Sequence, residues 1–334
     1  MGRPGTGKPL SVARPPTPDQ SWMVPARDGT HLYVEAYGDP AAPPLVMTDG
    51  LGCNGSFFAY VIPHFLEVVR VIRWNYRAHG RSEVPDDPAR MTVADCVEDL
   101  FEVCDALGID RAVHLGYSMG VEVVLDAAHA RPGRMHAMVL ACGSPGRLPD
   151  TFHSNTWARS ILPVFYLLAT RYKGPMMRLM HRVVPTHLMY LLSSLTEFDG
   201  RLVGWPDMQP YLDHITSLDL EAGANLLASA AEHDTRPFLK DIRVPALVVG
   251  ARRDRFAPFY LSEEMYQALP DAEMFAVQGA THSLMLEQPD LFNLGVEDYL
   301  RRRGLLLAPR SGSPGAARGP GARGRRAVRR PSGA

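Results

Sequence analysis

A serine between two glycines is the feature of this sequence best suited to chemistry. The segment Gly116-Tyr117-Ser118-Met119-Gly120 has the pattern G-x-S-x-G and directly follows the run from Ala112 to Leu115. A strand before such a pattern and a helix after it hold the serine in a tight turn, with its hydroxyl projecting from the sheet edge. The amides of the helix N-terminus then favour developing negative charge. We therefore predict that Ser118 is a nucleophile.

A serine hydroxyl needs a base that accepts its proton and an acid that orients the base. His282 lies in VQGATHSLMLEQPD, in the turn after the last expected strand. Asp254 lies in GARRDRFAP, in the loop after the expected strand Ala246–Gly250. The other common position for the acid, in the segment from Cys142 to Pro145, has no carboxylate. The sequence therefore predicts a triad of Ser118, Asp254 and His282.

The pattern of apolar residues indicates which elements position this triad. Continuous apolar runs are typical of strands buried on both faces, and helices are expected between them. Helices are predicted over Met119–Ala130, over Leu261–Leu269, and after Thr92, which forms a capping box with Asp95. The expected strands are His31–Tyr37, Pro44–Thr48, Val69–Trp74, Ala112–Gly116, His136–Ala141, Ala246–Gly250 and Glu273–Val277. This alternation predicts an α/β fold with a mostly parallel sheet flanked by helices.

One connection is much longer than the others. The segment between Ala141 and Val244 exceeds what a βαβ unit needs, and it contains the apolar, helical patterns ILPVFYLLAT, MMRLMHRVV and HLMYLLSSL. We predict an inserted helical cap over the carboxyl edge of the sheet. The expected organisation is a flexible segment 1–22, a core of 23–145 and 236–304, a cap of 146–235, and a disordered basic tail 305–334.

Composition narrows the class of protein. The 334 residues carry a net charge of −1, which favours neither a nucleic-acid binder nor a trap for acidic ligands. Residues 301–334 contain ten arginines and no acid, so residues 1–300 hold 25 basic and 36 acidic residues. No apolar run approaches the ~18 residues that a membrane span needs. The four cysteines, Cys53, Cys96, Cys104 and Cys142, form no CxxC pair, which predicts free thiols, no metal site and a cytoplasmic protein.

Together these motifs resemble the α/β-hydrolase fold superfamily over residues 25–303. The order Ser118, Asp254, His282 is the order of that superfamily. The segment NYRAHGRS, residues 75–82, resembles its D-x-R-G-x-G-x-S loop, and DGLG, residues 49–52, stands in place of its His-Gly oxyanion loop. The resemblance implies a serine hydrolase whose oxyanion hole consists of the backbone N–H groups of Leu51 and Met119. It implies neither a metal nor an organic cofactor.

Two residues depart from the pattern of the superfamily. Asp49 replaces the usual histidine of the His-Gly pair, and Asn75 replaces the usual aspartate. A carboxylate at position 49 can repel the developing oxyanion, position a water, or orient the loop by hydrogen bonds. We expect that it orients the loop.

The cap is expected to line the substrate pocket. We predict Phe165, Tyr166, Met177 and Tyr190 as substrate-binding residues, although such side chains also pack the core of a cap. They favour an uncharged, hydrophobic ester, thioester or lactone, cleaved through an acyl-serine intermediate. The expected partner is this small molecule, with no nucleic acid and no membrane span. The oligomeric state stays open.

Three alternatives stay open at this point. A carbon–carbon bond hydrolase or a cofactor-free perhydrolase of the same superfamily has the same triad. A ligand-binding or signalling protein can use a hydrolase scaffold. The cap and basic tail can also serve a partner- or membrane-associated protein. Epoxide hydrolases and haloalkane dehalogenases are disfavoured, because similar enzymes of those classes have aspartate where Ser118 stands.

Overall fold

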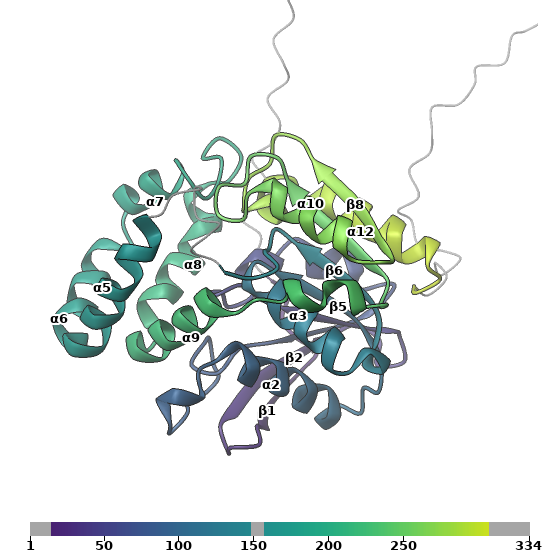
Figure 1. The fold of residues 1–334 in the computed structure, drawn as a ribbon, viewed down its shortest axis with the longest axis horizontal. Helices are drawn as coiled ribbons and strands as arrows, with labels where there is room; N and C mark the ends of the chain where they lie inside the picture. The colour runs from purple at the N-terminus through teal and green to yellow at the C-terminus, as the bar shows by residue number, and fades with distance from the viewer. Residues whose placement is uncertain (1–14, 148–156, 307–334) are drawn as a thin grey trace, which may run out of the picture.

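The computed structural model describes residues 15–147 and 157–306, and it shows one sheet with helices on both faces (Figure 1). Eight strands pair in the order β1-β2-β4-β3-β5-β6-β7-β8. The strands are β1 Gln20–Pro25, β2 His31–Tyr37, β3 Pro44–Thr48, β4 Arg70–Trp74, β5 Ala112–Tyr117, β6 Met135–Ala141, β7 Ala246–Ala251 and β8 Ala272–Val277. β2 pairs antiparallel with β1 and with β4, and every other pair is parallel. The predicted α/β class is confirmed.

The helices outside the long insertion divide between the two faces of the sheet. On one face, α2, α3 and α10 contribute to a single buried cluster, and on the other face α1, α11 and α12 contribute to a second. Their bounds are α1 Val61–Phe65, α2 Val93–Ala106, α3 Met119–Ala130, α10 Phe259–Ala268, α11 Leu284–Glu287 and α12 Pro289–Arg302. Short 3-10 turns lie at η1 Ser56–Phe58, η2 Pro88–Arg90, η3 Pro132–Arg134 and η5 Arg236–Asp241.

The pleat of the strands explains why continuous apolar runs occur. Successive side chains of a strand point to opposite faces. In β3, Leu45 and Met47 join the cluster under α1 and α12, whereas Val46 joins the cluster under α2 and α3. Both faces are covered by helices, so every position of such a strand is buried and apolar.

The strand predictions are confirmed to within one residue, with one omission. β1 was not predicted, and its Gln20–Pro25 overlaps the segment 1–22 that we expected to be flexible. β1 is an edge strand that pairs only with β2, and most of its side chains are exposed. Its backbone ladder therefore stabilises it more than apolar burial does, and a ladder leaves little trace in the sequence.

In its described residues, the long insertion between β6 and β7 is mainly helical, as predicted. Its helices are α5 Trp157–Arg171, α6 Lys173–Val183, α7 His187–Ser193, α8 Trp205–Ser217 and α9 Leu220–Glu232, and they lie together to one side of the sheet (Figure 1). We call these five helices the cap. Most of the predicted basic tail, residues 307–334, lies outside the described residues. No helix in the described ranges has the length and apolarity to cross a membrane.

Candidate active site

Ser118 joins β5 to α3 in a strained conformation. Its φ is 54° and its ψ is −120°, values that residues with a side chain adopt rarely. A Cβ placed on Gly116 would lie 2.4 Å from the carbonyl oxygen of Gly120, and one placed on Gly120 would lie 2.4 Å from that of Thr48. Only glycine at both positions lets the helix start so close to the strands. The tight turn predicted from the sequence is thus confirmed.

Ser118, His282 and Asp254 form a continuous hydrogen-bonded chain. Ser118 Oγ lies 3.1 Å from His282 Nε2, and His282 Nδ1 lies 2.9 Å from Asp254 Oδ2. The other carboxylate oxygen of Asp254 accepts hydrogen bonds from the amides of Phe256 and Ala257, at 2.8 and 2.9 Å. Asp254 can therefore hold the imidazole with Nδ1 protonated, which leaves Nε2 free to accept the serine proton.

The surroundings of His282 tune its basicity. Burial of the imidazole opposes protonation, but the negative charge of Asp254 and its hydrogen bond favour it, as do the charges of Glu197 and Glu287. The balance raises the pKa of His282 above its ordinary value of 6.5. The rings of Tyr117 and Phe256 lie 5.3 and 5.2 Å from the imidazole and shield it from water.

The loop after β3 approaches the serine closely. A Cβ placed on Gly50 would lie 3.0 Å from the Cβ of Ser118, so the backbone that carries the Leu51 amide passes beside the hydroxyl. The Met119 amide belongs to the first residue of α3, where a helix has no internal acceptor for its N–H groups. Both amides expected as oxyanion donors thus belong to backbone segments that meet at Ser118.

His79 supports this loop from the segment after β4. Its Nε2 accepts a hydrogen bond of 3.1 Å from the Gly52 amide, and its Nδ1 lies 3.0 Å from the Arg77 carbonyl oxygen. The tautomer with a proton on Nδ1 satisfies both contacts. Burial lowers the pKa of His79 to about 4, so the ring is neutral near pH 7 and can accept from Gly52.

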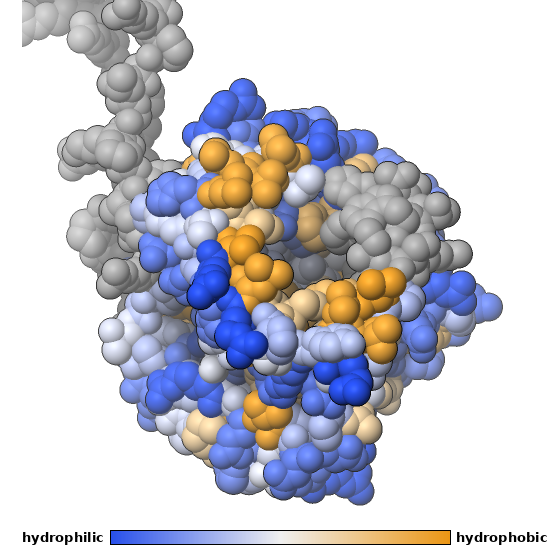
Figure 2. Space-filling view, turned by 90° about the vertical axis from the view of Figure 1, so that its left-hand side faces the viewer, coloured by the Kyte–Doolittle hydropathy of each residue, from blue (hydrophilic) through white to orange (hydrophobic). Residues whose placement is uncertain are grey.

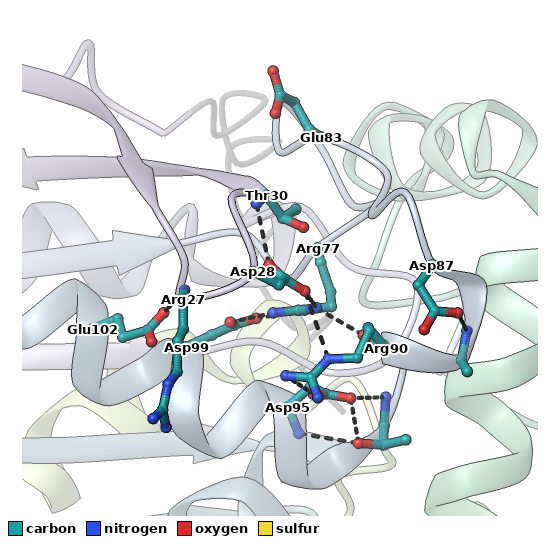
Figure 3. A network of polar contacts seen from close by, with 12 residues as sticks. Arg27, Asp28, Thr30, Arg77, Glu83, Asp87, Arg90, Asp95, Asp99 and Glu102 are labelled. Atoms are coloured by element: carbon teal, nitrogen blue, oxygen red, sulfur yellow. Dashed lines mark hydrogen bonds and ion pairs between the residues drawn. The ribbon is translucent and has the colours of Figure 1, made fainter.

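Arg77 anchors the segment that carries His79 (Figure 3). Its guanidinium contacts both oxygens of Asp99, on α2, at 2.5 and 2.8 Å, and it reaches Asp28 Oδ2 at 2.8 Å and the Arg90 carbonyl oxygen at 2.8 Å. Arg77 and Asp99 are both fully buried. A planar guanidinium held at so many points fixes the backbone direction of its segment. Sequence reasoning missed Asp99, although an acid within the apolar stripe of α2 was a usable signal.

Asp49 has an unusual electrostatic setting for an aspartate. It is buried, and neither carboxylate oxygen has a hydrogen-bond partner of good geometry among the described residues, although the Gly55 amide lies near enough to stabilise the charged form. The loop is instead held through its backbone, because Tyr76 Oη donates to the Asp49 carbonyl oxygen at 2.7 Å. Burial raises the pKa of the Asp49 carboxyl to about 7, against the opposing effects of Arg73, 3.9 Å away, and the Gly55 amide. Asp49 is therefore a buried acid next to the Gly55 amide and Arg73, and its role in orienting the loop stays a prediction.

The other departure, Asn75, sits inside the tight loop that follows β4. Its Oδ1 accepts from the Arg81 amide at 3.4 Å, and a Cβ placed on Gly80 would lie 2.4 Å from that oxygen. Gly80 also has a positive φ of 55°. The asparagine thus packs directly on the glycine, which leaves no room for another residue there.

The cap residues predicted to bind substrate have different surroundings in the structure. Phe165 and Met177 pack on a small cluster with Ala169, and Tyr166 is 40% exposed. Tyr190 donates from its hydroxyl to the Val203 carbonyl oxygen at 2.8 Å. None of these contacts reaches the triad, and a role of these four residues in binding substrate stays a prediction. Spacing along a helix shows a side chain's face but not which neighbour that face meets.

Other residues of the cap reach the site instead. The side chains of Tyr211, Ile215 and Leu218, on and just after α8, lie within 4.0 Å of a Cβ placed on Gly52. The Tyr211 ring also lies 5.3 Å from that of Phe57. α8 is therefore the cap helix that covers the oxyanion loop. Its sequence carried no signal for this role, because the placement depends on how the cap folds back.

Glu197 is a further acid that sequence reasoning missed. Its carbonyl oxygen accepts from Thr281 Oγ1 at 2.9 Å and from Ser283 Oγ at 3.2 Å, on either side of His282. Burial raises the pKa of its carboxyl to about 7, although the nearby charge of His282 and a hydrogen bond from Ser193 act the other way. The segment between α7 and α8 thus brings a second carboxyl near enough to the imidazole for the two charges to interact. Among the described residues no group of three His, Cys, Asp or Glu side chains is placed to hold a metal ion.

Comparisons with known proteins agree on one fold. Residues 43–289 match the family model described as alpha/beta hydrolase fold. A Rhizobium rhizogenes protein named as a provisional carbamate hydrolase, RutD, is 24% identical, with 82% of this chain and 98% of that protein covered. The 3-oxoadipate enol-lactonase 1 of Acinetobacter baylyi is also 24% identical, over 81% of this chain and 94% of its own. The crystal structure of an enol-lactonase from Burkholderia xenovorans superposes with a TM-score of 0.68, at 24% identity, over 84% of this chain and 100% of that one.

Proposed function

The chain belongs to the alpha/beta hydrolase fold family and is a hydrolase, and from that premise we propose that it cleaves a hydrophobic carboxylic ester, thioester or lactone through an acyl-serine. The observation that carries the proposal is the chain of hydrogen bonds from Ser118 Oγ through His282 to Asp254. It begins at a serine held in a strained turn, where its hydroxyl meets both a base and a helix N-terminus.

The first half of the reaction forms the acyl-enzyme. Ser118 Oγ attacks the carbonyl carbon while His282 Nε2 takes its proton, and Asp254 stabilises the imidazolium that results. The amides of Leu51 and Met119 donate to the oxyanion, each contributing on the order of 3 kcal/mol. The tetrahedral intermediate then collapses, and His282 gives the proton to the departing atom, which is the oxygen of an alcohol or enol or the sulfur of a thiol.

The second half regenerates the enzyme. A water molecule attacks the acyl-serine, and His282 accepts one of its protons. Collapse of the second tetrahedral intermediate releases the carboxylic acid, and Ser118 regains its proton from His282. No metal or redox group takes part in either half.

The walls of the site support an uncharged, apolar substrate. Phe57, Tyr117 and Tyr211 form a continuous aromatic contact beside His282 and the oxyanion loop. Glu197 faces the same imidazole, and its carboxyl disfavours substrates that carry a carboxylate. The names of the relatives, a carbamate hydrolase and an enol-lactonase, also describe attack on an acyl carbon.

A panel of p-nitrophenyl esters tests this function. We expect turnover of neutral esters, with kcat/KM rising with acyl length while the chain contacts the aromatic wall, and weak turnover of esters whose acyl chain ends in a carboxylate. Asp254→Asn should lower kcat by about 10⁴-fold, because the imidazole loses its correct tautomer. Rapid binding of the esters without any turnover by folded wild-type protein would contradict the proposal and favour a ligand-binding role.

A further inference from the structure

The cap exposes most of the large apolar side chains that the described residues leave open to water. We define the cap face as the exposed apolar side chains of α5 to α7 and the residues just after α7. They are Val164, Leu167, Leu168, Leu179, Val183, Leu188, Leu191, Leu192 and Leu195, with exposed fractions between 40 and 67%. Scattered apolar residues are normal on a protein surface, whereas a concentration on three neighbouring helices marks an interaction site.

The spacing of these residues shows that whole helix faces point outward. Leu188, Leu191, Leu192 and Leu195 follow the spacing i, i+3, i+4, i+7, which places them on one side of α7 and its continuation. Leu179 and Val183 are four residues apart on α6, a helix with no buried residue. A surface helix normally turns such a stripe toward the core. Here the stripes lack a partner within the described chain.

The charge of the same helices is of one sign. Residues 163–196 contain no aspartate or glutamate, and their basic residues are Arg171, Lys173, Arg178 and Arg182. Lys173 pairs with Asp219, but no described acid forms an ion pair with Arg178 or Arg182. Residues 1–300 as a whole have 36 acidic residues against 25 basic ones. The helices that carry the cap face are therefore cationic, on an otherwise acidic body.

The two properties occur together on the surface. Figure 2 looks onto the cap side of the molecule and shows apolar patches around a hollow, with hydrophilic groups between and around them. A basic helix with an apolar face is the arrangement that lies in the interface of a membrane, with its cations among the headgroups.

We propose that the cap face docks on the surface of an anionic lipid bilayer. The leucines enter the boundary between headgroups and acyl chains, and the arginines contact lipid phosphates. The acidic remainder of the body is repelled by the same surface, so the molecule approaches cap first. A second copy of the chain fits the face less well, because two cationic faces repel each other.

This inference does not depend on catalysis. If the proposed function also holds, docking places the cap, and the site that α8 covers, next to a phase in which apolar esters concentrate. The two claims fail separately, because vesicle binding is measured without substrate and ester turnover is measured without vesicles.

Vesicle flotation of the full-length chain tests the proposal. The probes are vesicles of phosphatidylcholine alone and of phosphatidylcholine mixed with phosphatidylglycerol. We expect the protein to bind the anionic vesicles at least about tenfold more tightly than the neutral ones. This binding should weaken as the salt concentration rises. Leu188→Glu/Leu191→Glu and, separately, Arg178→Glu/Arg182→Glu should each lower that binding at least about tenfold. Leu294→Glu, on α12 and 59% exposed, is the matched control and should bind like wild type.

All substituted side chains are exposed, so circular dichroism should show unchanged folding. The two double variants test the apolar contact and the charge contact separately. The proposal is overturned if wild type binds neither vesicle, or binds both equally. It is also overturned if both cap variants bind as tightly as wild type, which would assign binding to the arginine-rich tail. Sedimentation velocity adds one more outcome. If wild type is a dimer and Leu188→Glu/Leu191→Glu is a monomer, the cap face binds a second copy of the chain and the proposal is overturned.

Discussion

At the residue scale, we expect the charge around His282 to set the pH at which the proposed site works. The imidazole must be neutral to accept the Ser118 proton, and Asp254, Glu197 and Glu287 stabilise its charged form. We expect kcat/KM to fall as the pH drops through the raised pKa of His282, which lies above 6.5. Glu197→Gln removes one of these negative charges, so the midpoint of the pH profile should move to lower pH.

The control for this prediction is Glu232→Gln, at the exposed end of the cap helix α9. It should leave the midpoint where wild type has it. A profile of Glu197→Gln that coincides with wild type, or moves to higher pH, would show that Glu197 does not act on the imidazole.

Asp49 should make the folded state less stable as the pH rises, whereas a carboxyl with a lowered pKa makes it more stable. Its pKa is about 7 in the folded chain against 3.8 for an ordinary aspartate, so the folded state binds more protons between these values. The free energy of unfolding should therefore fall as the pH rises from 4 to 7, by on the order of 3 kcal/mol from this group. Asp49→Asn cannot ionise, and Arg73 keeps its ion pair with Glu35.

Urea unfolding of wild type and Asp49→Asn at a series of pH values measures this contribution. The difference between the two proteins should change steadily between pH 4 and 7 and stay constant above pH 8. A difference that does not vary with pH would mean that Asp49 ionises normally and has a partner in the folded state.

The types of the triad residues were readable from the sequence, but their electrostatic setting was not. Ser118, Asp254 and His282 each follow a strand at the position where this fold turns, so local pattern located them. Asp49 and Glu197 acquire raised pKa values from burial, which elements distant in sequence produce. Only the folded chain shows that Glu197, in the segment between α7 and α8, lies near enough to His282 for their charges to interact.

At the element scale, two helical glycines should respond in opposite ways to alanine. A Cβ on Gly120, in α3, would lie 2.4 Å from the Thr48 carbonyl oxygen and 2.7 Å from that of Asp49. Backbone cannot yield as a side chain can, so Gly120→Ala should cost about 3 kcal/mol or more. A Cβ on Gly223, in α9, meets nothing within 4 Å, so Gly223→Ala should stabilise the protein by about 0.5–1 kcal/mol.

Chemical denaturation with ester turnover alongside measures both variants. Gly120→Ala should also lose activity, because a shifted α3 moves Ser118 and the Met119 amide. Equal stability of the two variants would show that α3 does not need its close approach to β3.

Elements whose ends are marked by a nearby sequence motif were predicted well. Elements that depend on contacts with distant parts of the chain were not. The capping box of Thr92 and Asp95 fixes the start of α2 and is present in the structure. β1 was missed, because pairing with β2 creates it. Which neighbour the faces of α5 and α7 meet could not be predicted, because amphipathic spacing indicates a stripe but not its neighbour. The contact between α8 and Gly52 arises only once the cap is placed.

At the scale of the whole molecule, the core and the cap should differ in stability. The sheet is covered by two large buried clusters, whereas only Ala169, Leu220 and Ala224 are buried in the cluster within the cap. We expect the amides of α6 and α7 to exchange with deuterium orders of magnitude faster than those of β5 and β6. Equal protection across cap and sheet would mean that they unfold as one unit.

The alternation of strands and helices predicted the architecture, and the length of one connection predicted the insertion. Both predictions rest on many residues together, so an error in the bounds of one strand or helix does not change the predicted architecture. The cap's outward apolar faces were not foreseen, since a leucine stripe normally predicts burial. The same stripes that suggested a packed cap, or a lined pocket, are in large part exposed.

The central claim is that Ser118 is the activated nucleophile, and intact-mass spectrometry after fluorophosphonate treatment tests it most directly. Wild-type protein should gain the mass of one phosphonyl group and lose esterase activity in step. Ser118→Ala, shown to be folded by circular dichroism, should gain no mass and hydrolyse no ester. Labelling of Ser118→Ala to the same extent as wild type, or ester turnover by that variant, would contradict the account.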